Sequence, residues 1–373
     1  MESVLVDAGV YEPVDVTPDV TNDTVAEAAG STRAELVAAG RGAAVDAMAR
    51  GATSVVSELF DEGRLDGIVA LGGSGGSAIA TAAMRALPVG VPKLMVSTLA
   101  SGDTRPYVGA VDITMMYSVV DIAGINAVSA RIIGNAAAAI AGMASTEPHS
   151  VESKPLIAAS MFGVTTPCVT HARALLEERG YDVLVFHATG TGGQSMEKLA
   201  GEGVLAGMLD VTTTELADDL VGGVLSAGPT RLEAAGSAGI PQVVSLGALD
   251  MVNFGAVDTV PVEFRTRTLY RHSPAVTLMR TTPEECAELG RRVGAKLATA
   301  TGPTAVFVPR RGVSTIDVEG QPFHDPEADE ALRAGLRETI GSVEIHELEL
   351  DINDERFAAA MANRLLELIE EEG

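Results

Sequence analysis

Apolar residues follow two different spacings along this chain. Short runs rich in Val, Ile and Leu predict buried strands, and longer Ala-rich stretches with apolar residues at helical spacing predict helices. In the first half, the predicted strands are residues 4–8, 67–71, 93–98 and 113–118. The predicted helices there are two within 32–62, one over 77–86 and one over 126–143.

The second half repeats this alternation of strands and helices. The predicted strands are 156–161, 183–188, 207–211, 242–245, 275–278, 305–309 and 344–349. The predicted helices are 167–179, 195–201, 215–220, 230–238, 283–299, 326–339 and 354–371. Thr166 and Thr282, each followed by Pro, are predicted N-caps. Strands that alternate with helices are typical of α/β proteins with parallel sheets covered on both faces.

The segment 145–154 interrupts the pattern. It is polar and contains Pro148, which is typical of a linker. A chain of 373 residues also exceeds the usual size of one hydrophobic core. We therefore expect two domains, residues 1–150 and 151–373.

The composition defines the core and the expected compartment. Apolar residues make up 46% of the chain but aromatic residues only 3%, so Ala, Val, Leu, Ile and Met must form the core. We expect no membrane span, because no apolar run reaches the ~18 residues required. The first residues, Met1 to Val4, lack a secretory signal, so we expect a cytoplasmic protein. Cys168 and Cys286, far apart and without neighbouring ligands, predict buried thiols rather than a zinc or disulfide framework.

The net charge of −25 arises from 51 acidic and 26 basic residues spread along the chain. Such a surface repels nucleic acids and anionic membranes, so neither is an expected partner. An acidic surface with few lysines is suited to concentrated salt, where screening weakens self-repulsion. The charge therefore predicts a halophilic protein.

A glycine-rich turn follows the predicted strand 67–71 and leads into a helix. It consists of Gly72, Gly73, Ser74, Gly75, Gly76 and Ser77. Glycine allows close backbone approach to a ligand, and free N–H groups at a helix start attract phosphate. A dinucleotide fold would place an acidic residue at the end of the next strand, where Ser97 and Thr98 stand instead. This disfavours a nicotinamide cofactor.

A second turn of the same kind follows the predicted strand 183–188. It contains Gly190, Thr191, Gly192 and Gly193. Neither turn carries the Gly-Lys pair of a P-loop. Glycine also serves ordinary tight connections, so a purely structural role stays open for each turn.

Polar residues follow two further predicted strands. Thr212, Thr213, Thr214 and Glu215 form one group, in which Thr214 is also a candidate N-cap. Ser97, Thr98, Asp103 and Arg105 form the other, in which Arg105 either clamps a phosphate or pairs with Asp103. Ligands of open sheets bind beyond the carboxyl ends of strands, where both groups lie. The candidate metal carboxylates are Asp103, Asp121, Asp210, Glu215 and Asp250.

Two histidines and one serine are candidates for catalysis. His187 precedes the second turn, and His272 lies in a polar segment, although a structural hydrogen bond is the favoured interpretation for each. Gly72 to Gly76 also match Gly-x-Ser-x-Gly, which keeps open a hydrolase or acyl-transfer enzyme with Ser74 as its nucleophile.

Several of these segments together resemble the Tm-one-like ATP-binding family. They are residues 72–93, 95–98, 101–103, 163–170, 187–193 and 212–218. The resemblance implies two Rossmann-like domains with a ligand cleft between them, ATP or a related nucleotide with Mg²⁺, and a homodimer. It implies no reaction: an enzyme using ATP on a small-molecule substrate and a non-catalytic regulator that binds a protein partner both stay open.

This chain differs from the family at its N-terminus. Family members usually begin with a strand and a Gly-Thr-x-Asp-Thr-Lys-Gly-like turn, whereas residues 4–9 here resemble the family's second strand. Either the start codon lies upstream of Met1, which we expect, or this protein has lost the edge strand and first helix of the family.

Overall fold

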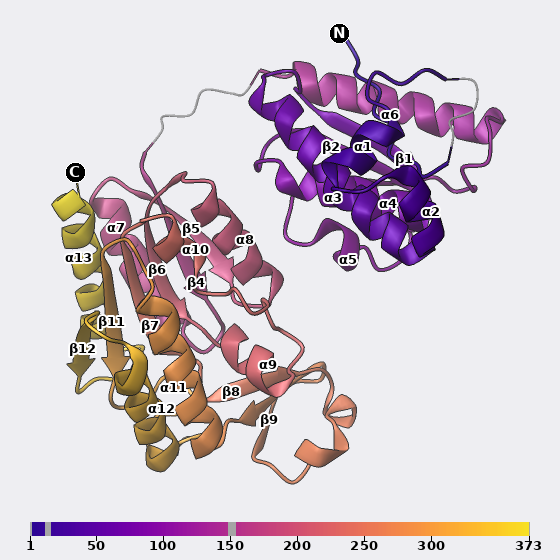
Figure 1. Cartoon of the computed structure of the whole chain (residues 1–373). Helices are drawn as coiled ribbons and strands as arrows, with labels where there is room; N and C mark the ends of the chain where they lie inside the picture. The colour runs from indigo at the N-terminus through magenta and orange to yellow at the C-terminus, as the bar shows by residue number, and fades with distance from the viewer. Residues whose placement is uncertain (1, 12–15, 148–153, 373) are drawn as a thin grey trace. The chain divides into compact units, whose positions relative to one another are not determined.

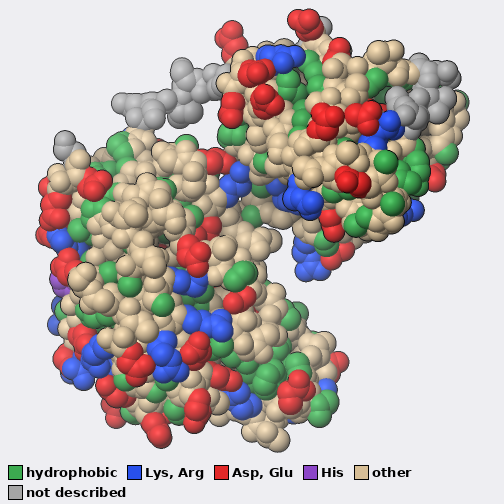
Figure 2. Space-filling model, viewed as in Figure 1, with side chains coloured by type: hydrophobic (Ala, Val, Ile, Leu, Met, Phe, Trp, Pro, Cys, Tyr) green, Lys and Arg blue, Asp and Glu red, His purple; other side chains and the backbone are tan. Residues whose placement is uncertain are grey.

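The computed structural model describes residues 2–11, 16–147 and 154–372. The chain divides into two compact units, Met1–Ser150 and Val151–Gly373, which are treated separately below (Figure 1). The predicted linker, 145–154, lies largely outside the described residues. Acidic side chains are scattered over the visible face of both units rather than gathered in one patch (Figure 2).

Unit 1 contains a three-stranded parallel sheet. Its strands β1 (Ile68–Gly72), β2 (Lys93–Ser97) and β3 (Thr114–Tyr117) lie in the order β1-β2-β3. α3 (Arg41–Asp61) and α4 (Ser74–Ala86) pack together on one side, and α6 (Ala127–Ser145) packs on Leu94 and Val96 of β2. The shorter helices are α1 (Asn22–Ala28), α2 (Arg33–Ala39) and α5 (Arg105–Val108).

The predicted first strand, 4–8, is wrong as a strand. Its apolar residues Val4, Val6 and Ala8 do pack on the core of unit 1. However, its pairing is limited to one isolated parallel bridge, between Val6 and Val20. The other three predicted strands of this half are present as β1, β2 and β3.

The expectation that no segment could span a membrane needs correction at α6. By length and composition alone, this 19-residue helix is long and apolar enough to cross a membrane, and only 11% of its most apolar 18-residue stretch is buried. Ile132, Ala136 and Ile140 nevertheless pack against the sheet. α6 therefore lies on the sheet of unit 1 as one of its layers.

Unit 2 contains a six-stranded parallel sheet in the order β12-β11-β7-β6-β4-β5. These strands are β4 (Leu156–Met161), β5 (Asp182–His187), β6 (Leu205–Thr212), β7 (Gln242–Gly247), β11 (Thr304–Pro309) and β12 (Glu344–Leu348). α7 (Thr166–Glu178) and α13 (Glu355–Glu372) cover the face of Ile157 and Ala159. The other face, that of Ala158 and Val244, is covered by α8 (Thr191–Gly201), α10 (Ala234–Ser237), α11 (Pro283–Leu297) and α12 (Pro326–Thr339). Both units thus confirm the predicted α/β class.

A small antiparallel sheet was predicted only in part. It consists of β8 (Met251–Phe254), β10 (Val276–Arg280) and β9 (Leu269–Ser273), of which only β10 was expected. Asn253 interrupts the apolar pattern of β8 because its amide bonds to Asp218 inside the protein. β9 was not predicted, because its polar residues Arg271 and His272 are typical of a loop.

The predicted helix ends were partly right. Thr282 caps α11 with a capping box to Glu285, as expected. Thr166 is not an N-cap: it is the first residue of α7, and its hydroxyl bonds back to the carbonyl of Phe162. The predicted helix 230–238 shrinks to α10, because Leu232 has a positive φ of 77°.

α11 and α12 pack closely at glycines. A Cβ on Gly290 would lie 2.1 Å from the carbonyl oxygen of Leu332, and one on Gly335 would lie 2.0 Å from that of Ala287. Glycine is needed at both positions because the backbone of the facing helix occupies the space of a side chain.

Gly290→Ala should therefore lower the free energy of unfolding of unit 2. Overpacking costs about 1–3 kcal/mol, more than the helix-propensity gain of about 1 kcal/mol. Urea unfolding followed by circular dichroism measures the effect. Gly201→Ala, at the end of α8 with nothing within 4 Å of its added Cβ, is the control and should not destabilise. Equal stability of the two variants would contradict the packing described.

Candidate functional site

The first glycine-rich turn connects β1 to α4 in unit 1. Gly73 is the N-cap, and among the described residues no side chain makes a capping hydrogen bond at the start of α4. Gly72 is required by packing, since its Cβ would lie 2.9 Å from Gly76. At Gly73, Gly75 and Gly76 an added Cβ would meet nothing closer than 3.5 Å. An uncapped helix start beside open glycines is a suitable position for an anion.

Two buried serines hold this turn against β2. The hydroxyls of Ser77 and Ser97 lie 2.7 Å apart, and Ser97 also accepts the N–H of Leu99 at 3.0 Å. The N–H of Thr98 reaches the carbonyl of Gly72 at 3.4 Å. The structure therefore brings together the predicted residues of β1, α4 and the end of β2. Ser77 and Ser97 are internal, whereas Thr98 is half-buried.

A polar cavity of about 360 Å³ adjoins Thr98 at the carboxyl ends of β2 and β3. Its other lining residues are Tyr117, Ser118, Val119, Val120 and Asp121. Val119 has a φ of 62°, a left-handed conformation that is strained for a β-branched residue. Strained backbone of this kind is concentrated at functional sites. The sequence singles out Asp121 only as a candidate metal carboxylate, and it carries no signal for Val119.

Arg105 and Asp103 pair with each other on the surface. Their closest atoms lie 2.7 Å apart, and both side chains are exposed. The hydrogen bonds from Arg105 lower the pKa of Asp103 to about 2. Of the two uses predicted for Arg105, the structure shows the ion pair.

The second glycine-rich turn connects β5 to α8, and the carboxylate of Glu215 fills it. Oε1 of Glu215 accepts the N–H of Gly190 at 2.7 Å and that of Gly193 at 3.1 Å. A Cβ on Gly193 would lie 2.1 Å from Oε2 of Glu215. Glu215 therefore takes the position at which a phosphate was predicted. A ligand at this turn would have to use the N–H groups of Thr191 and Gly192.

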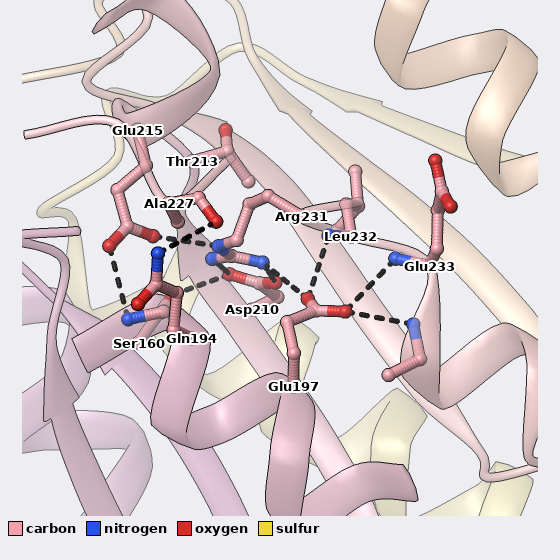
Figure 3. A network of polar contacts seen from close by, with 12 residues as sticks. Ser160, Gln194, Glu197, Asp210, Thr213, Glu215, Ala227, Arg231, Leu232 and Glu233 are labelled. Carbon is pink, nitrogen blue, oxygen red and sulfur yellow. Dashed lines mark hydrogen bonds and ion pairs between the residues drawn. The ribbon is translucent and has the colours of Figure 1, made fainter. Parts of the chain in front are cut away.

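A buried arginine, Arg231, holds Glu215 in place. Its Nε donates to Oε2 of Glu215 at 2.7 Å, and its two terminal nitrogens donate to Asp210 at 2.5 and 2.7 Å (Figure 3). Glu197 of α8 accepts a further bond at 3.1 Å. Arg231, Asp210 and Glu215 have no exposed surface. No sequence feature indicates the role of Arg231, because nothing in the neighbouring residues marks this side chain as buried.

The charges of this network act on one another. Burial alone would lower the pKa of Arg231, but the carboxylates of Asp210, Glu215 and Glu197 outweigh it and keep that pKa well above its usual value. Burial raises the pKa of Glu215, and Arg231 opposes this rise. Arg231 thus permits carboxylates to be ionised where no water reaches them.

The threonines after β6 are buried and face the protein. Thr212 bonds to Thr165 at 2.7 Å, Thr213 donates to the carbonyl of Ser245, and Thr214 donates to that of Met251. Thr214 is the N-cap residue of α9 (Glu215–Val221), as predicted, but its side chain makes no capping hydrogen bond. Each hydroxyl is already used inside unit 2, so its role as a ligand contact stays a prediction without support from these contacts.

Asp218 on α9 is a buried carboxyl that the sequence did not single out. Burial raises its pKa to about 7, although the hydrogen bonds from Asn253 and Leu225 lower it. Nδ2 of Asn253 lies 2.6 Å from it. A further candidate, Asp250, is also fully buried and accepts the hydroxyl of Ser314 at 2.8 Å.

Among the described residues, the candidate catalytic side chains have no acid or base placed beside them. His187 and His272 are exposed at the end of β5 and on β9. Ser74 is the first residue of α4, and the one histidine of unit 1, His149, lies outside the described residues. Among the described residues, no group of three or more His, Cys, Asp or Glu is placed to hold a metal ion.

Sequence comparison identifies the family. The N-terminal domain of the uncharacterised protein family UPF0261 matches residues 1–149, and its C-terminal domain matches residues 154–369. The chain belongs to the UPF0261 family.

Bacterial and plant relatives agree with this assignment. This UPF0261 chain is 53% identical to a UPF0261 protein of Clostridium tetani, over 99% of the chain and 93% of that protein. It is 51% identical to one of Rhizobium meliloti, over 96% of the chain and 89% of that protein. It is 43% identical to the ToMV resistance protein Tm-1 of Solanum lycopersicum, over 88% of the chain and 45% of that protein. The predicted family resemblance is confirmed.

In this UPF0261 protein, Arg231→Met should destabilise unit 2 by about 3–5 kcal/mol, because it leaves buried carboxylates without their counter-charge. Arg173→Met is the control: it removes an ion pair with Glu177 on the surface, worth at most about 1 kcal/mol. Urea midpoints measure both changes. Similar losses in the two variants would contradict the role assigned to Arg231.

The raised pKa of Asp218 predicts that part of the stability of unit 2 is lost as the pH rises. Its pKa is higher in the folded protein, about 7, than in the unfolded chain, so the stability it contributes is complete below about pH 4 and is lost as the pH rises towards 7. Asp218→Asn should remove this part of the fall. The measurement is the urea midpoint at intervals from pH 4 to 8, and an unchanged slope in Asp218→Asn would show that Asp218 does not titrate in this range.

Proposed function

We propose that this protein binds a nucleotide, ATP or a close relative, with its phosphates at the glycine-rich turn of unit 1. The uncapped start of α4 carries the proposal. The turn before α8 in unit 2 binds the carboxylate of Glu215, whereas in the part of the chain that the structure describes no side chain caps the start of α4. Two helix starts of similar sequence therefore differ in whether they can accept an anion from outside.

The adjoining polar cavity supports the same proposal. Thr98 contributes a hydroxyl and Asp121 a carboxylate, and both line that cavity. Mg²⁺ in nucleotide sites is usually held by one or two carboxylates together with phosphate oxygens. Asp121 fits this role, since its carboxylate is exposed and pairs with no described basic residue; it accepts only the N–H of Ile122. Thr98 would contact a phosphate oxygen.

Location, salt dependence and assembly belong to the same proposal. A cytoplasmic location is supported by the buried free thiols of Cys168 and Cys286. Function in concentrated salt is supported by the net charge of −25. A homodimer is supported by the apolar outer side of α6, where Val128 and Met143 are exposed.

The role of the nucleotide has two candidate forms. One is an enzyme that uses ATP on a small molecule. The other is a nucleotide-dependent regulator that binds a protein partner, which the relationship to a ToMV resistance protein favours. Release of phosphate from ATP by the purified protein would distinguish the enzyme from the regulator.

Melting temperature in the presence of Mg²⁺-ATP tests the binding proposal. At one hundred times the dissociation constant, a ligand adds about 2.7 kcal/mol of stability, so the melting temperature should rise. Gly73→Val should abolish the rise, because its side chain would fill the approach to α4 beside Thr98 without a clash in the protein. Asp121→Asn should remove only the part of the rise in melting temperature that depends on Mg²⁺.

The control is Gly134→Val on α6, where an added Cβ meets nothing within 4 Å. Gly192→Val is unsuitable, because its Cβ would lie 1.7 Å from the carbonyl oxygen of His187 and would disturb folding. The scans are run in low and in molar KCl. No rise with any nucleotide at either salt concentration, or a rise that Gly73→Val leaves intact, would refute the proposal.

A further inference from the structure

Residues 310–325, called the strap below, join β11 to α12 in unit 2. The strap contains no helix or strand, and all of its residues are described. Much of it is nevertheless buried, including Val313, Ser314, Ile316, Asp317 and Phe323. Long loops that have no secondary structure and are packed inside a compact domain usually have a function.

The strap crosses the carboxyl edge of the six-stranded sheet. The N–H of Thr315 donates to the carbonyl of Val164, just after β4, at 3.0 Å. The carbonyl of Val313 accepts the N–H of Ala248, just after β7, at 2.9 Å. β6 lies between β4 and β7 in the sheet, so the strap passes over the carboxyl end of β6. Ligands of open parallel sheets bind at this edge.

A buried arginine, Arg280 at the end of β10, holds the strap in this position. Its Nε donates to the carbonyl of Phe323 in the strap at 2.7 Å. Its Nη2 donates to Oδ1 of Asp329 on α12 at 2.7 Å and to Oδ1 of Asp317 in the strap at 3.2 Å. The antiparallel sheet, the strap and α12 are therefore tied together by one guanidinium group.

Two carboxyls bond to the first part of the strap. Oδ2 of Asp317 accepts the N–H of Val313 at 2.9 Å, and Oδ2 of Asp250, after β7, accepts the hydroxyl of Ser314 at 2.8 Å. Oδ1 of Asp250 is buried and has no described hydrogen-bond partner. Neither Asp250 nor Asp317 has any exposed surface.

The cluster holds three carboxyls for one guanidinium group. If Asp250, Asp317 and Asp329 were all ionised, Arg280 would compensate only one of three negative charges in a place that water does not reach. Buried like charges favour the protonated form of one of them. Burial, and then the charges of Asp250 and Asp329, raise the pKa of Asp317 to about 9. Burial also raises the pKa of Asp250, against the effect of Arg280.

Further titratable or charged groups face this cluster from α11, α12 and the strap itself. Arg333 pairs with Glu330 on α12 at 2.8 Å, so it is already engaged. The carboxylate of Asp325 caps α12, while its carbonyl lies 3.5 Å from Nη2 of Arg280. The remaining groups are the thiol of Cys286 and the imidazole of His324.

We propose that the cluster of Asp250, Arg280, Asp317 and Asp329 binds one proton when the strap is closed, and that loss of this proton to the solvent opens the strap. Without the proton, the carboxylates repel one another. Arg280 and Asp329 lie in regular structure, so the strap is the part that yields. Opening would uncover the end of β6, where Thr212 and Thr213 are now fully buried.

The direction of the pH effect follows from the raised pKa of Asp317. In an open strap this carboxyl is exposed and has an ordinary pKa of about 4. The closed form therefore binds one more proton than the open form between about pH 4 and pH 9. Its stability is complete below this range, and opening becomes about tenfold more favourable for each pH unit until pH 9 is reached.

Cys286 on α11 reports on the opening of the cluster. Its Sγ is buried and lies 3.6 Å from Nη1 of Arg280. The test uses the full chain with Cys168→Ala, which removes the other cysteine. The rate of alkylation by iodoacetamide is measured from pH 6 to 10 at constant KCl and divided by the rate for the same chain unfolded in urea. This ratio should rise about a hundredfold from pH 7 to 9 and then level off.

Two variants in the cluster test the source of the rise. Asp317→Asn keeps the shape of the protonated carboxyl and cannot ionise, so it should remove most of the rise. Asp250→Asn removes a charge that raises the pKa of Asp317, so its rise should level off at a lower pH. The control is Asp218→Asn, a buried carboxyl with a raised pKa outside the cluster, which should leave the rise unchanged.

Amide hydrogen exchange locates the opening. Relative to the unfolded chain at each pH, exchange at Val313 and Thr315 should follow the alkylation of Cys286, whereas exchange at Leu209 in β6 should not.

Four results would overturn the inference. One is an alkylation ratio that stays constant from pH 7 to 9. Another is a rise that persists unchanged in both Asp317→Asn and Asp250→Asn, which would place the proton elsewhere. Continued protection of Val313 and Thr315 while Cys286 reacts would show that the strap stays closed. A parallel loss of far-ultraviolet circular dichroism would show that the whole of unit 2 unfolds.

Discussion

The buried ion pairs of Arg231 are the interaction on which unit 2 depends most. One guanidinium group binds Asp210 at the end of β6, Glu215 at the start of α9 and Glu197 on α8. Each of these carboxylates bonds to other groups in turn: Glu215 to the turn after β5, and Glu197 to the N–H groups of Leu232, Glu233 and Ala234. A strand, two helices and two loops are therefore fixed relative to one another by a single side chain.

This network also determines what the second glycine-rich turn does. Gly190 has a φ of 85°, and Gly193 leaves the space that the carboxylate of Glu215 occupies. Both glycines are therefore explained by the protein's own packing. In unit 1 no described carboxylate bonds to the turn before α4, and an added Cβ on Gly73, Gly75 or Gly76 would meet only ordinary contacts. The same local sequence pattern serves internal packing in one unit and leaves an open helix start in the other.

The sheet of unit 1 is smaller than the parallel sheet of unit 2. The six-stranded sheet of unit 2 is covered by helices on both faces, and its central strands β4, β6, β7 and β11 are paired on both sides. In unit 1, β1 is an edge strand with alternately exposed residues, and an apolar groove runs beside it. The groove is lined by residues 5–11 and Val69 to Leu71, and also by Gly75 and Gly76 of the turn before α4. It therefore adjoins the proposed nucleotide site.

The sequence by itself determined the α/β class, most of the parallel strands and the helices that start at a marked cap such as Thr282. These depend on local spacing, because burial on one face of a helix or both faces of a strand imposes a period on nearby residues. It also located the turn before α4, and it gave Arg105 and Asp103 as a pair, since both lie within three residues.

Only the tertiary structure decided the features that depend on distant partners. Arg231 and Glu215 are 16 residues apart, and the antiparallel β8 and β9 are held by β10 rather than by their own apolar pattern. Whether residues 4–8 form a strand depends on a neighbour, because a strand exists only when its backbone groups are paired. Residue spacing reports how each segment is buried, but which carboxylate fills a turn and which edge stays open are settled when segments far apart in the sequence meet.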